Sequence, residues 1–471
     1  MSVLSTILQV ALLILVVLMV FNIIIFVHEL GHFWAAKWRG LQIDRFQIWF
    51  GKPIWKKEVN GVQYGIGWIP AGGFVALPQM APMEALEGGD KHTHPLPAIT
   101  PLDKIIVAFA GPLFSMMLAL ASAVIVWQVG KPKDFIASQE VGYVVPDSPA
   151  AKAGLQPGDK IVKINGEPVN GFAGSLNSIT ERIVLSRGQQ ITYTVERPGE
   201  ANPVVLESGF ETEKTRWFQR GGLRQIGIDS AGPAIIGKVS PNSPAADAGL
   251  GKGDRITSID GRNLYSLMQF SQYLRDNDWK TVRLGITTAD GSTREIELTP
   301  EKPVQPEGMD PMVGIEWDFS SEVDTRIVHP GPIQQVADSL HMMWITITSV
   351  VAKDSSIGVS HLSGPVGIGS MMFSFLQMED GWRRILAFMV LFNVNLAVLN
   401  MLPFPVLDGG HITLALLEKI SGRPVKAKPL EILQTICALL LISLMLFVTS
   451  KDIGDKFGRG GGQRQEIVFP K

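Results

Sequence analysis

The residues best suited to chemistry in this sequence are His28-Glu29-Leu30-Gly31-His32, an H-E-x-x-H pattern. On a helix, residues i and i+4 lie on the same face, so the two imidazoles would stand side by side with Glu29 next to them. Two histidines in this arrangement can hold a zinc ion, and the adjacent glutamate can act on a water molecule at the metal. We therefore predict a zinc hydrolase site in which His28 and His32 bind the metal and Glu29 is the catalytic base.

An uncharged apolar run, residues 3–27, leads directly into this motif. About 20 apolar residues are enough to cross a bilayer. The run is unlike a secretory signal, because no Lys or Arg precedes it and no small-residue cleavage site follows it. We expect a retained transmembrane helix over residues 1–40, with the metal motif in its last part.

The composition is that of a membrane protein with water-exposed domains. Charged residues make up 18% of the 471 residues, below the ~25% of soluble domains. The formal net charge of −2 gives no reason to expect a nucleic-acid partner. The single cysteine, Cys437, excludes a disulfide framework within one chain and a cysteine zinc cluster.

Three further apolar stretches, residues 105–128, 384–402 and 431–449, are also long enough to span a bilayer. The basic residues nearest to the first helix follow it, so the positive-inside bias places the metal motif towards the cytoplasm. Four spans then put the tail, residues 451–471, on the outer side, although its Lys and Arg residues run against this rule. The tail is polar and rich in glycine, and we expect it to be disordered.

The loop between the first two spans contains strand-like segments on the cytoplasmic side. Residues 43–50 and 62–69 are rich in aromatic and β-branched residues, which is typical of strands. Pro70-Ala71-Gly72-Gly73-Phe74 follows, and two glycines there fit an ordinary hairpin turn or a close approach of another backbone. In the second case Gly72, Gly73 and Phe74 would bind an extended substrate segment by strand addition.

Residues 130 to about 325 have the composition of a soluble protein and contain an internal repeat. VPDSPAAKAGLQPGDKIVKING (145–166) matches VSPNSPAADAGLGKGDRITSIDG (239–261) at a constant offset of 95 residues. Each copy predicts a strand, a short helix, a Gly-Asp turn and a second strand, and the pattern resembles bacterial PDZ domains. Such domains take extended peptides at a sheet edge. The alternative is that the two copies serve only as spacers or as a steric lid.

The expected domain organisation follows from these segments. It comprises a first transmembrane helix (1–40), a cytoplasmic-side β-hairpin region (41–104), a second transmembrane helix (105–129), two PDZ domains (130–222 and 223–320), an interfacial amphipathic helix region (326–375), a third transmembrane helix with its following motif (384–415), a fourth transmembrane helix (431–450) and a polar tail (451–471).

A catalytic zinc site needs a third protein ligand and an open position. The preferred candidate is Asp408, which follows the third span in the stretch NMLPFPVLDGGH (400–411). A carboxylate at that depth is costly unless it is paired or bound to metal. Pro403 and Pro405 cannot continue a helix and leave the chain extended there. The competing ligands are His411, His92 and His94, of which the last two lie in a polar stretch typical of a solvated loop.

Together these features resemble the site-2 protease family of intramembrane zinc metalloproteases, in particular its regulator of sigma-E protease branch with tandem PDZ domains. The resemblance rests on HELGH, PAGGFV (70–75), AGP (110–112), the repeat and NMLPFPVLDGGH, and it covers nearly the whole chain. It implies one zinc ion per chain, held by His28, His32 and Asp408. It also implies that Glu29 is the catalytic base.

The same resemblance implies roles outside the metal site. Asn400, Pro403 and Pro405 would shape substrate handling, and PAGGFV would belong to a membrane-associated β-hairpin that helps to bind the cleaved strand. One departure is visible, because Leu113-Phe114-Ser115 stands where many relatives have an asparagine soon after the Gly-Pro of the second span. This departure concerns local packing rather than the chemistry.

The implied fold is a polytopic α-helical membrane protein with about four transmembrane helices, a membrane-associated β-hairpin and two inserted α+β PDZ domains. The implied enzyme is a metalloendopeptidase that cuts within single-span membrane proteins, such as an anti-sigma factor already trimmed by another protease, or leftover signal peptides. Its PDZ domains would bind a peptide or exclude bulky substrates. It would lie in the bacterial inner membrane, with the PDZ domains on the periplasmic side and the zinc site towards the cytoplasm.

Two functions of other classes compete with this reading. A membrane-anchored PDZ scaffold with a dead metal site would bind no zinc, although the intact motifs argue against it. A membrane-tethered protease for soluble substrates would carry its motif in a polar domain, whereas here the motif continues an apolar span. No G-x-S-x-G nucleophile elbow supports a serine protease.

Overall fold

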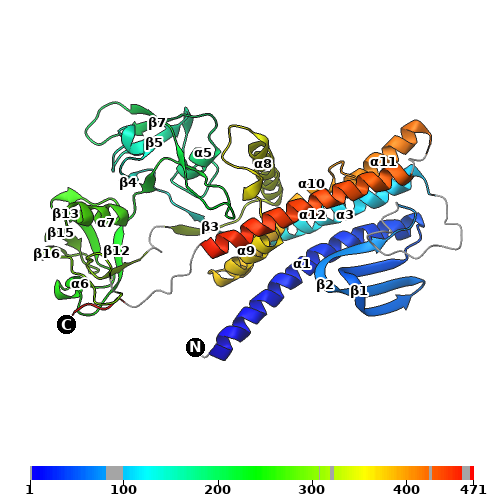
Figure 1. The fold of residues 1–471 in the computed structure, drawn as a ribbon, viewed down its shortest axis with the longest axis horizontal. Coiled ribbons are helices and arrows are strands. Elements are labelled where there is room, and N and C mark those ends of the chain that lie inside the picture. The colour runs from blue at the N-terminus through cyan, green and yellow to red at the C-terminus, as the bar shows by residue number, and fades with distance from the viewer. Residues whose placement is uncertain are drawn as a thin grey trace. The chain divides into compact units, whose positions relative to one another are not determined.

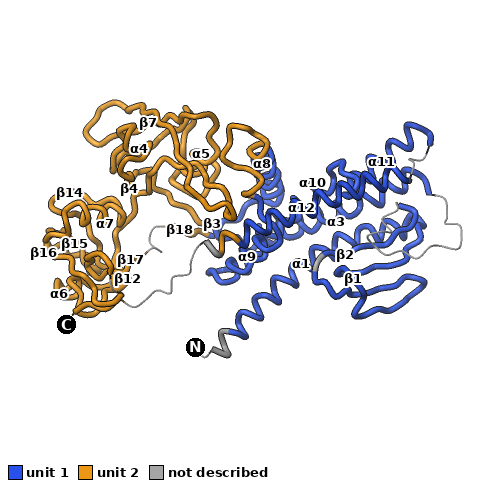
Figure 2. Tube along the Cα trace, in the orientation of Figure 1, with its two compact units in different colours: residues 1–132, 327–347, 362–453 blue, residues 133–326, 348–361, 454–471 orange. Residues whose placement is uncertain are grey.

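The computed structural model describes residues 3–80, 99–306, 308–318, 323–423, 427–458 and 467–470. These residues divide into two compact units (Figure 2). The first unit comprises residues 1–132, 327–347 and 362–453, and the second comprises residues 133–326, 348–361 and 454–471.

Four helices in the described part of the chain are long and apolar enough to cross a membrane (Figure 1). They are α1 (Val3–Arg39), α3 (Pro101–Val129), α10 (Gly381–Asn400) and α12 (Ala427–Gly458). The expectation of four spans is confirmed. Three of the helices extend beyond the apolar stretches because polar residues continue or cap them, as Thr100 and Asp103 do at the start of α3 in a capping box.

Helices α1 and α3 pack closely because small residues lie at their contact. A Cβ atom added at Gly31 would lie only 2.4 Å from the carbonyl oxygen of Ala110, so only glycine permits this approach. At the end of α1, Arg39 Nη2 lies 2.6 Å from Asp103 Oδ1 on α3. These contacts fix the helix that carries the H-E-x-x-H motif against the second span.

The predicted hairpin is present, and both of its strands extend further than expected. Strand β1 (Arg45–Val59) pairs antiparallel with β2 (Val62–Ala76), which continues through the two glycines. Because β2 bends, Ile48 pairs with both Ile66 and Gly73. Gly72 permits the bend with φ +71°, and a Cβ atom there would lie 1.9 Å from the Phe50 ring. Residues 73–76 therefore form an outer edge, and no other described strand pairs with them.

The segment after the second unit's lobes contains one expected helix and further helices whose bounds were not predicted. Helix α8 (Pro332–Val351) matches the expected amphipathic segment, and a short 3₁₀ helix, η2 (Val359–His361), follows. Residues 361–372 are rich in glycine, yet α9 (Pro365–Gln377) begins within them. Asp452 of α12 accepts hydrogen bonds from the backbone N–H groups of Gly364 (3.0 Å) and Gly367 (2.7 Å), and so caps α9. The stretch after Asp408 likewise forms α11 (Asp408–Ser421).

The second unit contains two β-rich lobes with one core each. The first lobe comprises β4 (Val141–Val144), α4 (Pro149–Lys152), β5 (Lys160–Ile164), β6 (Glu167–Pro168), α5 (Ile179–Leu185), β7 (Ile191–Glu196), β8 (Val204–Ser208), β9 (Glu211–Thr212), β10 (Arg224–Gln225) and β11 (Ile228–Ser230). The second lobe comprises β12 (Ala234–Val239), α6 (Pro244–Asp247), β13 (Arg255–Ile259), β14 (Arg262–Asn263), α7 (Leu267–Asp276), β15 (Val282–Thr287), β16 (Thr293–Leu298) and β17 (Ile315–Trp317). Strands β3 (Lys131–Phe135) and β18 (Asp324–Val328) form a separate pair.

Both lobes are built from antiparallel sheets, in the orders β6-β5-β7-β8 and β16-β15-β13-β12-β17. The first lobe continues beyond residue 222, where the sequence placed its end. Strand β11 pairs with β4, and Ile226, 1% exposed, belongs to the first core. The boundary differs because β11, the strand that pairs with β4, is the last strand of this lobe in sequence order. The sequence alone does not assign this strand to the first lobe.

The first lobe contains an ionic clamp at its Gly-Asp turn. Asp159 is 1% exposed and accepts hydrogen bonds of 2.8 Å from both Nε and Nη2 of Arg197. The same Nη2 donates to the carbonyl oxygen of Gly154 at 2.8 Å. The clamp ties the turn after α4 to strand β7.

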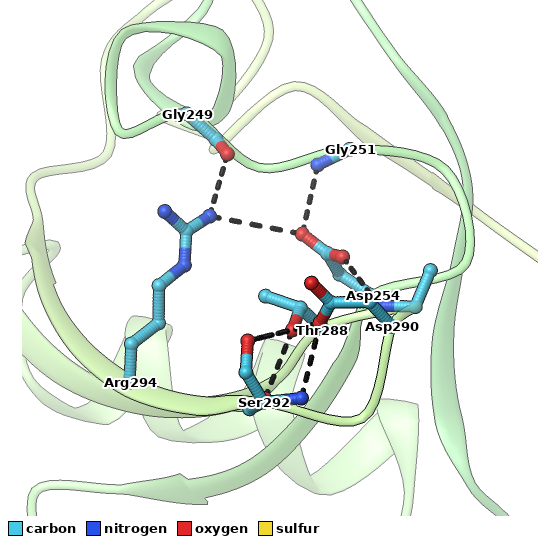
Figure 3. A network of polar contacts seen from close by, with 8 residues as sticks. Gly249, Gly251, Asp254, Thr288, Asp290, Ser292 and Arg294 are labelled. Carbon is cyan, nitrogen blue, oxygen red and sulfur yellow. Dashed lines mark hydrogen bonds and ion pairs between the residues drawn. The ribbon is translucent and has the colours of Figure 1, made fainter.

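The second lobe repeats this clamp in a looser form (Figure 3). Arg294 Nη2 donates to the carbonyl oxygen of Gly249 at 2.6 Å and lies 3.8 Å from Asp254 Oδ2. Asp254 also accepts from the backbone N–H of Gly251 at 3.0 Å. Asp254 and Gly249 each lie 95 residues after their counterparts in the first lobe, which is the offset of the sequence repeat.

Candidate metal centre and active site

Three candidate metal ligands converge in the first unit, although one lies far from the others in the sequence. His28 Nε2 lies 3.3 Å from His32 Nε2, and each nitrogen lies 3.3 Å from an oxygen of Asp408. Among the described residues, these form the one group of His, Cys, Asp or Glu whose ligand atoms all lie within 4.8 Å of one another. Ligands on a tetrahedral zinc ion with bonds of ~2.0–2.1 Å are ~3.3 Å apart, so the spacing fits zinc.

The second nitrogen of each imidazole has a hydrogen-bond partner on α3. His32 Nδ1 lies 2.8 Å from the carbonyl oxygen of Val107, which can only accept, so Nδ1 carries a proton. His28 Nδ1 lies 2.9 Å from Ser115 Oγ. In the tautomer in which His28 Nδ1 also carries a proton and donates to Ser115 Oγ, both Nε2 lone pairs face each other and the carboxylate. A cation would stabilise this arrangement, and the two Nδ1 contacts orient both rings for it.

The space at these nitrogens depends on a glycine of α3. A Cβ atom added at Gly111 would lie 2.2 Å from His32 Nε2 and 2.9 Å from His28 Nε2. Any other residue would push its side chain into the position where the two rings meet. The Ala110-Gly111-Pro112 stretch therefore shapes the candidate metal site as well as helix packing.

Asp408 reaches the histidines from the first turn of α11. Helix α10 ends at Asn400, and the intervening loop, residues 401–407, returns the chain before α11 begins at Asp408. Cβ atoms at Gly409 and Gly410 would lie 2.2 Å and 2.0 Å from carbonyl oxygens of this loop. The two glycines permit the close turn, and the first turn of a helix favours a negative charge.

One carboxylate oxygen of Asp408 lacks a hydrogen bond to the described residues. Its Oδ2 atom is buried and makes no hydrogen bond to the described residues, although it lies 3.3 Å from His28 Nε2. A buried carboxylate without full hydrogen bonding is costly, and a metal ion at this position would remove that cost.

Glu29 lies beside both histidines and next to the outer edge of β2. A Cβ atom added at Gly73 would lie 3.4 Å from Glu29 Cγ and 2.9 Å from the side chain of Ile25. The backbone of Val75 lies near the Glu29 carboxylate. The edge of β2 thus passes directly along the residue expected to act as base.

A cavity of about 1160 Å³ joins the metal ligands to the edge of β2. Its lining includes, besides the three candidate ligands, Glu29, Gly72, Gly73, Phe74, Asn400 and His411. The amide nitrogen of Asn400 lies 3.4 Å from His28 Nε2. Pro403 and Pro405 lie in the loop between α10 and α11 and do not line the cavity, and the carbonyl oxygen of Pro405 accepts from Gln434 at 3.3 Å.

Of the competing ligands, His411 is described by the structure and does not join the candidate metal group. His411 lies one turn after Asp408 and lines the cavity, but its ring is not among the converging ligand atoms. Burial lowers the pKa of His411. His92 and His94 lie outside the described residues, so the structure provides no position for them.

Sequence reasoning missed the residues of α3 that support the metal ligands. It treated Ser115 as part of a departure from a family pattern, whereas the structure places its hydroxyl on His28. The sequence also did not predict that the carbonyl of Val107 binds His32, or that Gly111 leaves space for the two imidazole rings. The available signal was the Gly-x-x-x-Ser spacing, which puts both residues on one face of a helix.

Comparison with known proteins matches residues 16–444 to a family described as peptidase family M50. The regulator of sigma-E protease RseP of Salmonella typhimurium (strain 14028s / SGSC 2262) is 30% identical over 443 residues, which cover 90% of this chain and 94% of that protein. RseP of Escherichia coli (strain K12) is 30% identical over 441 residues with the same coverage. Among solved structures, the PDZ domain of an SdrC-like protein from Listeria innocua matches 18% of this chain and 94% of that chain, at 24% identity and a TM-score of 0.17.

Proposed function

The chain belongs to peptidase family M50 and is a multi-pass intramembrane zinc metalloprotease similar to RseP, and from this premise we propose that it cuts within the membrane-spanning segments of single-span membrane proteins. One observation carries the proposal: His28, Glu29 and His32 lie on α1, a helix long and apolar enough to cross a membrane. A peptide bond that reaches this site must come from within or near the bilayer.

One zinc ion per chain would be held by His28, His32 and Asp408, whose ligand atoms have the required spacing. When bound, zinc acts as a Lewis acid that polarises the scissile carbonyl and acidifies water. The carbonyl oxygen of Val107 holds the proton on His32 Nδ1, and Ser115 Oγ would accept the proton of His28 Nδ1, so that both Nε2 atoms would be available to the metal.

Glu29 would be the catalytic base. Its carboxylate takes a proton from the attacking water and later gives it to the leaving amine, which is how a positioned carboxylate serves both steps of hydrolysis. Its position next to Gly73 and Val75 brings this proton transfer to the edge of β2.

The substrate would bind as an added strand at residues 73–76. A helical substrate hides its carbonyl groups in its own hydrogen bonds, so it must unwind before hydrolysis. The unpaired outer edge of β2 provides backbone partners for the unwound segment, and Gly73 and Phe74 line the cavity there. Asn400, near His28, would hold the substrate backbone, and Pro403 and Pro405 would keep its loop extended.

The substrates we propose are a membrane-anchored anti-sigma factor already trimmed by another protease, and leftover signal peptides. The printed names of the RseP relatives, which refer to sigma-E regulation, support the first. We also propose that the two lobes are PDZ domains that lie on the periplasmic side of a bacterial inner membrane, where they exclude substrates with bulky outer domains. The zinc site would then lie towards the cytoplasm.

The proposal is tested with purified full-length variants and a membrane-anchored model substrate. Glu29→Gln should keep about one zinc ion per chain in elemental analysis but lower the cleavage rate by about 10²–10⁴-fold, the usual contribution of a general base. Glu58→Gln, at an exposed position of β1, is the matched control and should cleave like the unmodified chain. Cleavage by Glu29→Gln at the unmodified rate would disprove the mechanism.

A second variant tests the third ligand separately. Asp408→Asn should lose zinc, because a carboxamide is a poorer ligand than a carboxylate, whereas His411→Asn should retain it. If Asp408→Asn retained zinc and His411→Asn lost it, the third ligand would be His411 and not Asp408. An unmodified chain that binds no zinc would favour the scaffold function instead.

A further inference from the structure

The described residues of the tail, for which the composition predicts disorder, have a defined position. Residues Ile467–Pro470, here called the tail segment, lie against the second lobe, next to α6 (Figure 1). Val468 forms an antiparallel bridge with Gln305. Its carbonyl oxygen accepts from the backbone N–H of Val304 at 2.7 Å, and its own N–H donates to the carbonyl oxygen of Gln305 at 3.0 Å.

The tail segment also inserts an aromatic side chain into this lobe. Phe469 is 2% exposed, while the neighbouring Val468 is 43% exposed. The Phe469 ring lies beside Gly314 and Ser243, since a Cβ atom at Gly314 would lie 2.9 Å from its Cε2 atom and 2.3 Å from the Cβ of Ser243. Gly314 has φ +80°, which glycine adopts without strain. The lobe thus holds the ring where a side chain at residue 314 would otherwise lie.

These contacts have the two parts of a peptide-recognition site. Backbone hydrogen bonds to Val304 and Gln305 align an extended segment whatever its sequence, and the buried ring adds preference for an aromatic residue. Full burial of a phenylalanine contributes about 1.5–3 kcal/mol, which corresponds to about a 10- to 150-fold change in affinity.

The chain connects this site to the end of α12. The last turn of α12 is itself fixed in the second unit, where Asp455 lies 3.2 Å from Arg220 Nε and Gly454 packs on the carbonyl oxygen of Phe218. Eight residues lie between Gly458 and Ile467, so the Cα atoms of these two residues are nine steps, or at most ~32 Å, apart. A docked tail segment therefore limits how far the Gln305 region can move from the end of α12.

We propose that the tail segment is an intramolecular ligand of the second lobe, bound by strand addition at Val304–Gln305 with Phe469 as its anchor. The site takes an extended peptide with one aromatic residue, and its occupant is this chain's own tail. Docking ties the second lobe to the end of α12. Two spans, α10 and α12, separate the lobe from the tail in sequence, so both lie on the same side of a membrane and can meet.

The first test is a disulfide between the paired residues in the full chain, with Cys437→Ser as background. Directly opposed residues of an antiparallel bridge have Cβ atoms ~4.5–5.5 Å apart, close enough for a disulfide after small adjustments. Gln305→Cys with Val468→Cys should cross-link within one chain on mild oxidation, as read by mass spectrometry of unreduced peptides. Thr293→Cys with Val468→Cys is the control, because β16 lies at the opposite edge of the sheet from β17, and it should not cross-link.

The second test uses a fluorescent peptide with the sequence of residues 463–471 and a chain that lacks residues 459–471. The peptide should bind the shortened chain, and a Phe469→Ala peptide should bind at least tenfold more weakly. The complete chain should bind the peptide at least tenfold more weakly than the shortened chain, because its own tail competes at high effective concentration.

Three results would overturn the proposal: equal binding of the two peptides, no binding to a shortened chain whose thermal unfolding is unchanged, or a disulfide that joins two chains instead of one. None of these readouts depends on proteolysis, so the test stands apart from that of the proposed function.

Discussion

At the scale of single residues, the candidate metal site is defined as much by α3 as by the three ligands. The H-E-x-x-H spacing and the cost of an unpaired carboxylate were enough to predict His28, His32 and Asp408 from sequence. The partners of the two Nδ1 atoms could not be predicted, because they depend on which face of α3 meets α1. That rotation is set by the close contact of Gly31 with Ala110.

Ser115 is the residue whose role can be tested most cleanly. Ser115→Ala should weaken zinc binding by about 10- to 100-fold, the usual effect of removing the partner that orients a histidine ligand. The measurement is zinc affinity by competition with a chelator. Ser122→Ala is the matched control, because Ser122 is also buried on α3 but is not among the residues that contact the histidines. Equal affinities of the two variants would show that Ser115 does not position His28.

At the scale of elements, the helices that span were predicted and the turns between them were not. Long apolar runs identify α1, α3, α10 and α12 without knowledge of their neighbours. The bounds of α9 and α11 were not predicted, because each helix has glycines in its first turns and glycine disfavours a helix. In the structure these glycines allow close packing or donate to Asp452, which a sequence window does not contain.

The bend of β2 is predicted to matter for cleavage but not for zinc binding. Gly72→Ala forces a side chain into positive φ, at about 1–2 kcal/mol, and onto the Phe50 ring, so residues 73–76 should shift away from Glu29. Cleavage should fall at least tenfold while zinc content stays constant. Gly61→Ala has similar strain, with φ +79°, but no atom lies within 4 Å of its added Cβ. Equal activity of the two variants would contradict substrate binding at this edge.

The two ionic clamps should differ in their contribution to stability. Arg197→Ala leaves Asp159 buried without its partner and should destabilise the first lobe by about 3 kcal/mol. Arg294→Ala should cost the second lobe less than about 1 kcal/mol, because Arg294 is 40% exposed and lies 3.8 Å from Asp254. Hydrogen exchange of the full chain, resolved by peptide, measures both lobes at once. The reverse order of the two losses would refute this assignment.

At the scale of the whole molecule, the order of the spans was predictable, but the contact between distant segments was not. The Lys and Arg residues of the tail still run against the positive-inside rule if four spans place the tail on the outer side. The bridge between Val468 and Gln305 nevertheless requires the tail and the second lobe to share one side, which four spans provide. A four-residue segment carries too little pattern for a sequence window to show that it docks.

The proposed role of the lobes as a size filter predicts a dependence on the substrate's outer part. A model substrate with a folded domain on the lobe side of its span should be cut at least tenfold more slowly than one with an unfolded linker of equal length. Initial rates with both substrates in the same vesicles measure this. Equal rates would exclude a filter and leave the lobes as peptide-binding domains or spacers.

The most direct test of the central claim is the position of the cut. The full-length chain and a single-span substrate are reconstituted together in vesicles, and the products are mapped by mass spectrometry. We expect a cleaved bond inside the substrate's spanning segment, and we expect this cleavage to disappear with Glu29→Gln. A cut confined to the water-exposed flanks, or an intramembrane cut that Glu29→Gln still makes, would contradict it.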